Sequence, residues 1–287
     1  MIEIFKNTKE SSIFLDYFIY CLTKLKYKYK IKFFDKDTNY DKYNILIKFN
    51  SKEIIVDYGD DSSNINKNDR LLCDKYIKCQ YLIENSFKNI TVAPLFRCLL
   101  NTKCGYNLKN SPHDYFKKFH SNEKKYKIVS YTNGHHSPGR LKIYNILEKK
   151  FPNDFKLISS NKRDKSKSFR NDGSLTYEEY IKFISSGYFI LNLIGKMDSN
   201  PLRCIDGYLS NTCIVSDNIL TKAFSDFPRY DLNISTKNDK FDENVLIKKF
   251  QYLVDNYKEI YNNLIIKQND WINNNFDEEK YIKLILE

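Results

Sequence analysis

The chain has 287 residues, of which 41% are hydrophobic and 29% charged, so it can bury a substantial core and is not a disordered polymer. A chain of this length is more typical of two domains than of one. The net charge of +11 favours phosphate-bearing or polyanionic partners. Because the lysines are spread along the chain among tyrosines and isoleucines, they favour a basic solvated surface over a nucleic-acid-binding tail.

The cysteine pattern excludes several other classes of protein. The seven cysteines include no Cys-x-x-Cys pair, and the four histidines do not complete a zinc-type spacing. We therefore expect reduced, mostly buried thiols and no metal site. The apolar stretch 13–22 is interrupted by Asp16 and is too short to cross a bilayer, and it lacks a signal-peptide cleavage site. The expected protein has no membrane span and is cytoplasmic.

The first part of the chain predicts several strands and one helix. Apolar residues at helical spacing occupy residues 11–27. Strand-like runs occupy residues 1–5, 31–35, 43–49, 53–59 and 76–83. This pattern is typical of an α/β domain with a partly parallel sheet. The polar stretch 108–125 follows, and we place the linker there, so the predicted domains are residues 1–118 and 119–287.

A more regular alternation of strands and helices begins at residue 126. Strands are predicted at 126–132, 155–159, 188–195 and 212–217, and helices at 138–151, 176–187 and 201–211. The predicted buried face of the first of these helices consists of Leu141, Tyr144, Leu147 and Phe151. Thr176 and Glu179 form a capping-box pattern. The alternation predicts a doubly wound parallel sheet, and from residue 242 onward the pattern is helical.

Ligands of such sheets bind beyond the carboxyl ends of the strands, so polar segments at that edge are candidate sites. Three segments lie there, namely residues 132–140, 161–170 and 195–201. In the first, Gly134 permits close backbone approach and Arg140 supplies guanidinium donors for a phosphate. A turn with nothing bound is the alternative. The absence of dinucleotide-binding and P-loop glycine motifs disfavours a dehydrogenase or a P-loop NTPase.

The third segment leads into a helix with two charged residues near its start. Ser199 or Asn200 can cap this helix, Arg203 falls in its first turn, and Asp206 lies one turn later. Arginine is unfavourable at a helix start on dipole grounds, so its presence indicates an anion. A carboxylate on the same face can accept hydrogen bonds from ribose, and the pair therefore predicts a nucleotide site. The alternative is an exposed Arg–Asp pair.

Residues 177–217 resemble the C-terminal half of exostosin-like, GT-B-type glycosyltransferases. The resemblance rests on Tyr180, the strand and loop from Phe189 to Gly195, the helix with Arg203 and Asp206, the strand residues 213–215, and Asp217. Asp206 stands where the family has Glu, and the Gly and Pro of the family's Gly-Cys-Ile-Pro-Val strand are missing. The N-terminal half is not matched. In its lysine- and asparagine-rich composition the chain looks like enzymes of large DNA viruses, which implies the host cytoplasm.

The resemblance implies a GT-B fold, in which two Rossmann-like domains face a central cleft and C-terminal helices pack back. It also implies transfer of a sugar from a nucleoside-diphosphate sugar, most often UDP-linked, to a glycan or glycoprotein hydroxyl. Such transfer is generally inverting, and we expect neither a metal nor another cofactor. Arg203, with Arg140, Lys162 or Arg163, would neutralise the diphosphate, and Asp206 would hold the ribose.

Further roles follow from the same resemblance. His135 and His136 would contact the sugar or the phosphate, and a base of the N-terminal domain would deprotonate the acceptor. Asp60 and Asp61 are the candidate bases, although an acidic turn after a strand is the alternative. A second hypothesis is a non-catalytic basic α/β module that binds nucleic acid or another polyanion. Asp206 disfavours it, because a carboxylate repels phosphate, and we expect no stable nucleic-acid partner.

Overall fold

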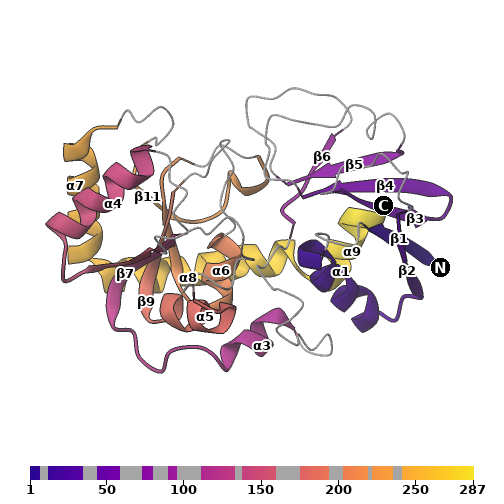
Figure 1. Cartoon of the computed structure of the whole chain (residues 1–287), viewed down its shortest axis with the longest axis horizontal. Helices are drawn as coiled ribbons and strands as arrows, with labels where there is room; N and C mark the ends of the chain where they lie inside the picture. Colours follow the sequence, from indigo (N-terminus) through magenta and orange to yellow (C-terminus); the bar gives the residue numbers. More distant parts are fainter. Residues whose placement is uncertain are drawn as a thin grey trace, which may run out of the picture.

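The computed structural model describes residues 1–6, 12–34, 44–58, 73–79, 90–95, 111–132, 138–159, 175–193, 203–218, 222–234 and 241–287. Within these residues the chain forms a mixed α/β fold with a six-stranded and a five-stranded sheet. The first sheet lies on the right of Figure 1 and the second on the left, and the long helix α8 (Tyr257–Asn275) extends between them. No helix of the described ranges is long and apolar enough to cross a membrane.

The first sheet contains the N-terminal strands in the order β2-β1-β3-β4-β5-β6. Their bounds are β1 Ile2–Lys6, β2 Tyr29–Phe33, β3 Asn44–Phe49, β4 Lys52–Asp57, β5 Lys75–Lys78 and β6 Ile90–Val92. The predicted partly parallel sheet is confirmed, because β3 runs antiparallel to both of its neighbours while the other pairs are parallel.

The antiparallel strand β3 departs from the Rossmann-like domain that the resemblance implies for this half. Its cause is a tight hairpin between β3 and β4, in which Phe49 pairs with Lys52. The two residues between them, Asn50 and Ser51, have φ values of 50° and 65°. Positive φ at both positions suits a two-residue hairpin turn, so the chain reverses here instead of crossing over through a helix.

Helices α1 (Ser12–Lys24) and α9 (Glu278–Leu286) pack together against the first sheet. The Tyr17 hydroxyl donates to the backbone carbonyl of Phe276, and the rings of Tyr17 and Tyr281 lie 4.9 Å apart. Lys75 Nζ of β5 donates to the backbone oxygen of Leu284 at 2.6 Å. The end of the chain therefore lies beside its beginning, and both termini are on the right of Figure 1.

The second sheet has the strand order β11-β10-β9-β7-β8, and every neighbouring pair is parallel. Its strands are β7 Tyr126–Thr132, β8 Phe155–Ser159, β9 Gly187–Asn192, β10 Cys213–Ser216 and β11 Tyr230–Asp231. The predicted parallel sheet is thus present. Its strand order changes direction between β7 and β9, because β8 lies on one side of β7 and β9 on the other. This is a topological switch point.

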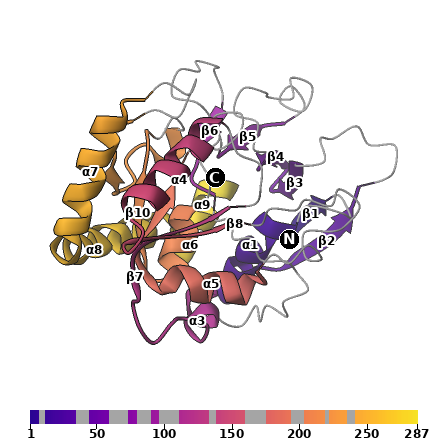
Figure 2. The ribbon, with the colours of Figure 1, turned by 60° about the vertical axis from the view of Figure 1, so that its left-hand side comes forward.

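Helices cover both faces of the second sheet. They are α4 Pro138–Lys150, α5 Tyr177–Ser185, α6 Arg203–Leu209 and α7 Glu243–Asp255. Side chains alternate along the strands, so Ile128 and Phe189 pack in one cluster with α4 and α7, whereas Val129 and Ile190 pack in another with α5 and α6. Figure 2 shows α4 and α5 on opposite sides of the strands. The predicted capping box of Thr176 and Glu179 starts α5.

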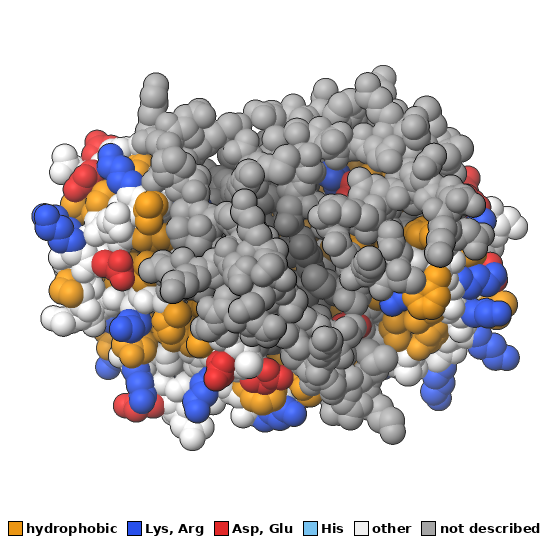
Figure 3. Space-filling model, in the orientation of Figure 1, with side chains coloured by type: hydrophobic (Ala, Val, Ile, Leu, Met, Phe, Trp, Pro, Cys, Tyr) orange, Lys and Arg blue, Asp and Glu red, His pale blue; other side chains and the backbone are white. Residues whose placement is uncertain are grey.

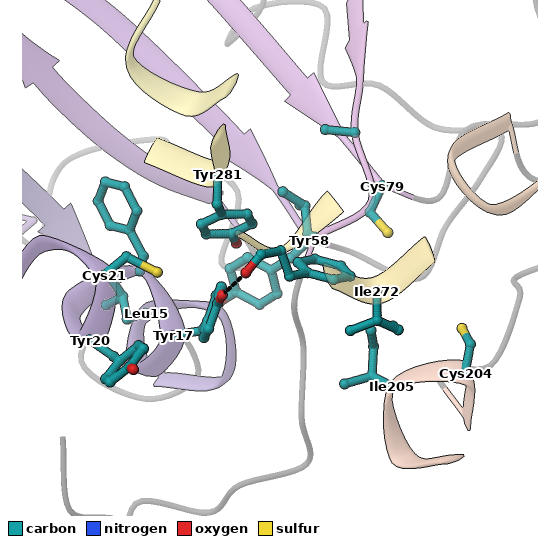
Figure 4. Close-up of a cluster of buried hydrophobic side chains, with 14 of the residues drawn as sticks. Leu15, Tyr17, Tyr20, Cys21, Tyr58, Cys79, Cys204, Ile205, Ile272 and Tyr281 are labelled. Carbon is teal, nitrogen blue, oxygen red and sulfur yellow. Dashed lines mark hydrogen bonds between the residues drawn. The ribbon is translucent and has the colours of Figure 1, made fainter. Parts of the chain in front are cut away.

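One hydrophobic cluster joins the two sheets. It contains Ile4 and Val56 from the first sheet together with Ile190 and Ile205 from the second half of the chain. Figure 4 shows residues of this cluster from α1, from the ends of β4 and β5, and from α6, α8 and α9. The connecting stretch 111–125, predicted as a linker, includes helix α3 (Pro112–Lys117), which packs against α6. The two halves of the chain therefore share a core.

Candidate functional site

Arg203 lies at the switch point between β7 and β9. It is the first residue of α6, and its Nη2 donates to the backbone oxygen of Tyr131 in β7 at 2.8 Å. Its Nη1 lies 3.5 Å from Oδ1 of Asn192, the last residue of β9. The guanidinium thus bridges the carboxyl ends of two strands whose connections run in opposite directions. In open α/β sheets this is where ligands bind.

Arg140 brings a second guanidinium to the same edge of the sheet. The predicted buried face of α4 is wrong in one residue, because Leu141 is 48% exposed. Arg140 is instead 7% exposed and shares the buried face with Ile143, Tyr144 and Leu147. The spacing of three, four and seven residues from Arg140 places all of them on one side of the helix. The arginine therefore occupies a position that an apolar residue normally fills.

The two arginines influence each other and the phenol of Tyr144. Burial lowers the pKa of Arg140, and the nearby charge of Arg203 lowers it further, against the opposing effects of Tyr144 and Asp217. Burial alone would raise the pKa of Tyr144, but the charges of Arg203 and Arg140 hold it below its ordinary value. Arg140 is buried and Arg203 is half-buried, so their like charges repel each other, and an anion between them would relieve that repulsion.

Asp206 lies in the interior of the protein, between α5 and α6. It is 2% exposed, and its Oδ2 accepts a hydrogen bond of 2.8 Å from the Tyr180 hydroxyl. Burial and the charge of Asp206 raise the pKa of Tyr180 well above its ordinary value. The alternative of an exposed Arg–Asp pair is therefore wrong. The contact of Asp206 with ribose stays a prediction. The Asp206 carboxylate already accepts one hydrogen bond, from the Tyr180 hydroxyl.

A glycine allows α6 to approach the sheet closely. A Cβ atom at Gly207 would lie 2.7 Å from both the Thr212 backbone oxygen and Ile214 Cδ1. The helix that carries Arg203 and Asp206 is thus held directly against β10. This close approach helps to fix both charged residues relative to the strand ends.

The other predicted site residues lie outside the described part of the chain: Asp60, Asp61, Gly134, His135, His136, Lys162, Arg163 and Ser199. Among the described residues, the structure brings Arg140 and Arg203 together and places Asp206 one helical turn from Arg203. The described ranges contain no group of three or more His, Cys, Asp or Glu side chains arranged to hold a metal.

Sequence reasoning missed two polar contributors to this site. Tyr144 reads as a core aromatic residue, yet its hydroxyl lies 3.4 Å from Ser130 Oγ and is influenced by both arginines. Asn192 ends a strand and is buried beside Arg203. A polar residue directly after a buried apolar run is a signal that could have pointed to Asn192. Tyr144 gives no such signal, because a tyrosine in an apolar stripe is ordinary.

Comparison with known proteins adds no family to these observations. No protein-family model matches the chain, and no curated protein matches it at a significant level.

Proposed function

We propose that this chain is a glycosyltransferase that transfers a sugar from a nucleoside-diphosphate sugar, UDP-linked in the first instance, to a hydroxyl of a glycan or glycoprotein. The observation that carries the proposal is the pair of guanidinium groups, Arg140 and Arg203, at the switch point of a parallel sheet. A diphosphate supplies the negative charge and the hydrogen-bond acceptors that a buried guanidinium, Arg140, and a nearby half-buried one, Arg203, can bind. The resemblance of residues 177–217 to exostosin-like enzymes supports the sugar-nucleotide assignment.

The relation between the two halves supports a GT-B arrangement. Tyr58 and Cys79, which directly follow β4 and β5, belong to the same buried cluster as Cys204 and Ile205 of α6 (Figure 4). Burial raises the pKa of the Cys204 thiol, and the nearby Cys79 raises it further. The carboxyl ends of β4 and β5 are thus directed toward the helix that carries Arg203. An acceptor site on the first sheet and a donor site on the second can then share one region.

In the proposed reaction the acceptor oxygen forms a bond with the anomeric carbon of the donor sugar. The bond between that carbon and the diphosphate oxygen breaks, and the diphosphate leaves with the bonding electrons. Arg140 and Arg203 stabilise the charge that develops on it, which is where fixed donors accelerate a reaction most. The acceptor proton passes to a base, for which Asp60 and Asp61 remain the candidates, and direct displacement inverts the anomeric centre.

The alternative function is a basic module that binds nucleic acid or another polyanion. On the face shown in Figure 3 the described Lys and Arg side chains are scattered over the two ends and the lower edge of the molecule, among acidic and apolar side chains. A polyanion site is normally a continuous basic surface. The buried setting of Arg140 also suits a compact phosphate group better than a long strand.

A thermal-shift panel separates the two functions. UDP, GDP, CMP and their sugars are tested with single-stranded DNA as the competing ligand. We expect stabilisation by a nucleoside diphosphate, because a ligand that binds only the folded state raises its stability. Stabilisation by DNA alone, with strong salt dependence, would overturn the proposal in favour of polyanion binding.

Replacing either arginine by methionine tests the site itself. Arg140→Met and Arg203→Met should each weaken binding of the stabilising nucleotide about tenfold or more, since a hydrogen bond to a charged group contributes about 1.5–3 kcal/mol. Donor hydrolysis should fall with it. Lys142→Met is the matched control, because Lys142 is an exposed cation of the same helix. Unchanged binding in both arginine variants would show that the nucleotide lies elsewhere.

A further inference from the structure

A row of polar side chains crosses the first sheet near the carboxyl ends of β4 and β5. Asn44 of β3 pairs with Asp57 of β4, and Asp57 pairs with Lys78 of β5. Tyr76 lies two residues before Lys78 and therefore on the same face of β5. All four residues are buried, beside the apolar cluster of Leu46, Ile55 and Tyr76. Sequence reasoning assigned no role to any of them.

The charges in this row are tightly connected. Lys78 Nζ lies 2.6 Å from Asp57 Oδ2, and the Tyr76 hydroxyl donates to the same oxygen at 2.8 Å. An ammonium group has three N–H donors. Among the described residues, Asp57 is the one hydrogen-bond partner of Lys78 Nζ, although the lysine side chain is only 1% exposed. Two donors of a buried cation therefore have no protein acceptor in the described part of the chain.

Buried ion pairs of this kind contribute little net stability. Removing two charges from water is unfavourable, and well-packed apolar residues in place of a buried pair are often as stable or more stable. Buried donors are normally hydrogen-bonded, so the N–H groups of Lys78 that have no acceptor among the described residues indicate an additional oxygen acceptor. The side chain of Asp57 is 9% exposed, so it is the member of the pair through which a ligand would approach.

We propose that Asp57 and Lys78 bind a hydroxyl group of the sugar acceptor. A hydroxyl donates one hydrogen bond and accepts others, so it can donate to the carboxylate while it accepts from the ammonium. An anionic ligand would be repelled by Asp57 and a cationic one by Lys78, whereas a neutral hydroxyl can bind both side chains at once. This inference rests on the proposed function, because it assigns the acceptor side of the same reaction to the first sheet.

The test replaces the pair as a unit. Asp57→Leu combined with Lys78→Met leaves no unpaired buried charge, and we expect this double variant to melt at or above the temperature of the wild type. Lys75→Met is the matched control, since Lys75 lies in the same strand and its ammonium donates to the Leu284 carbonyl. Should the double variant fail to fold, Asp57→Asn, which keeps the shape of the side chain, takes its place.

Two measurements are made on each variant with methyl glycosides as the acceptor probes. The first is transfer from the UDP-sugar that stabilises the wild type, beside hydrolysis of that donor by water. We expect the double variant to lose transfer at least tenfold while it keeps donor hydrolysis and stabilisation by UDP, and Lys75→Met to keep all three. Transfer at the wild-type rate in the double variant would overturn the hydroxyl site.

The second measurement is the thermal shift produced by the glycosides without a nucleotide. If no sugar nucleotide binds the wild type, but glycosides stabilise it and not the double variant, the transferase proposal fails and the hydroxyl site stands. Equal stabilisation of both proteins by glycosides overturns the hydroxyl site alone. If neither nucleotides nor glycosides stabilise the wild type, both proposals are overturned.

Discussion

Arg140 is predicted as a site residue, but its place on the buried face of α4 is not predicted. Its position after a strand predicts that it donates to a phosphate, and that role stays a prediction. Its burial on the core face of α4 is not predicted, because a charged residue is normally assigned to the solvent side of a helix. The long aliphatic stem of arginine can lie against apolar neighbours while the guanidinium reaches past them. Arg140 can therefore occupy a core position next to Ile143 and Tyr144.

Gly207 provides the residue-scale test of how α6 is positioned. In Gly207→Ala the new methyl group would meet the Thr212 backbone oxygen and Ile214 Cδ1, each at 2.7 Å. Because a backbone oxygen cannot move without shifting β10, we expect a loss of about 1–3 kcal/mol in the free energy of unfolding. Urea denaturation measures it, with the exposed Lys182→Ala of α5 as the control. A Gly207→Ala protein as stable as the wild type would mean that α6 can move away from β10 without cost.

At the scale of elements, α3 stands in the polar stretch where a linker is predicted. Ser111 caps it by accepting from the Asp114 backbone N–H at 3.1 Å, and Pro112 is its first residue. A Ser followed by a Pro is a typical start of a helix, so the sequence contains a local signal for α3. Helical periodicity gives no help, because α3 has only six residues. Its attachment to α6 depends on the His113 ring, which stacks on Tyr208 at 4.8 Å.

The contact between α3 and α6 should weaken in mild acid. Burial lowers the pKa of His113, and the charge of His120 lowers it further; burial also lowers the pKa of His120, against its hydrogen bond to the Leu209 carbonyl. The charge of Lys117 lowers the pKa of both histidines, and the charge of Lys124 lowers that of His120. The charge of Asp114 acts in the opposite direction on His113 and raises its pKa. The folded protein therefore binds fewer protons than the unfolded chain once the pH approaches the ordinary histidine value of about 6.5.

The stability that the two neutral rings contribute is thus fully present above that value and is lost as the pH falls through it. We expect the urea midpoint of the wild type to drop between about pH 7.5 and about pH 5.5. The combined variant His113→Phe and His120→Gln, which keeps an aromatic ring and a donor, should show a smaller drop. An equal drop in both proteins would assign the pH dependence to other groups.

At the scale of the whole molecule, the shared core and the position of α9 couple the two sheets. The cluster that contains Ile4 also contains Ile205 and Trp271, and α9 packs on α1 although it comes last in the chain. The predicted boundary at residues 118 and 119 therefore separates segments of sequence that share buried side chains. Two halves coupled in this way are expected to unfold together.

A single cooperative transition is the consequence that can be measured. Trp271 is the one tryptophan of the chain and lies in the shared cluster, so its fluorescence reports on that core, while far-UV circular dichroism reports on both sheets. The two melting curves should coincide. Ile205→Ala should shift both by the same amount, at a cost of about 2–5 kcal/mol, whereas the exposed Ile266→Ala should shift neither. Two separate transitions would show that the halves unfold independently.

The sequence by itself determined the strands β7 to β10 and the helices α4 to α6, but not the short edge strand β11. The predicted strands 126–132 and 155–159 have the bounds that the structure gives β7 and β8, and Thr176 caps α5 as expected. These features depend on local periodicity and on capping residues, which are written within a few neighbouring positions. The carboxyl-edge rule also indicated Arg140 and Arg203, because strand direction in an alternating α/β chain follows from the connections.

Only the tertiary structure decided which side chains meet. The hairpin that reverses β3, the burial of Asp206 under the Tyr180 hydroxyl, and the Asp57–Lys78 pair all depend on contacts with other segments. The sequence of β5 does not indicate that Lys78 is buried, because its ion-pair partner, Asp57, lies on the separate strand β4. Local pattern specifies an element, whereas the partner of a charged or polar side chain is set by packing between elements that are distant in the sequence.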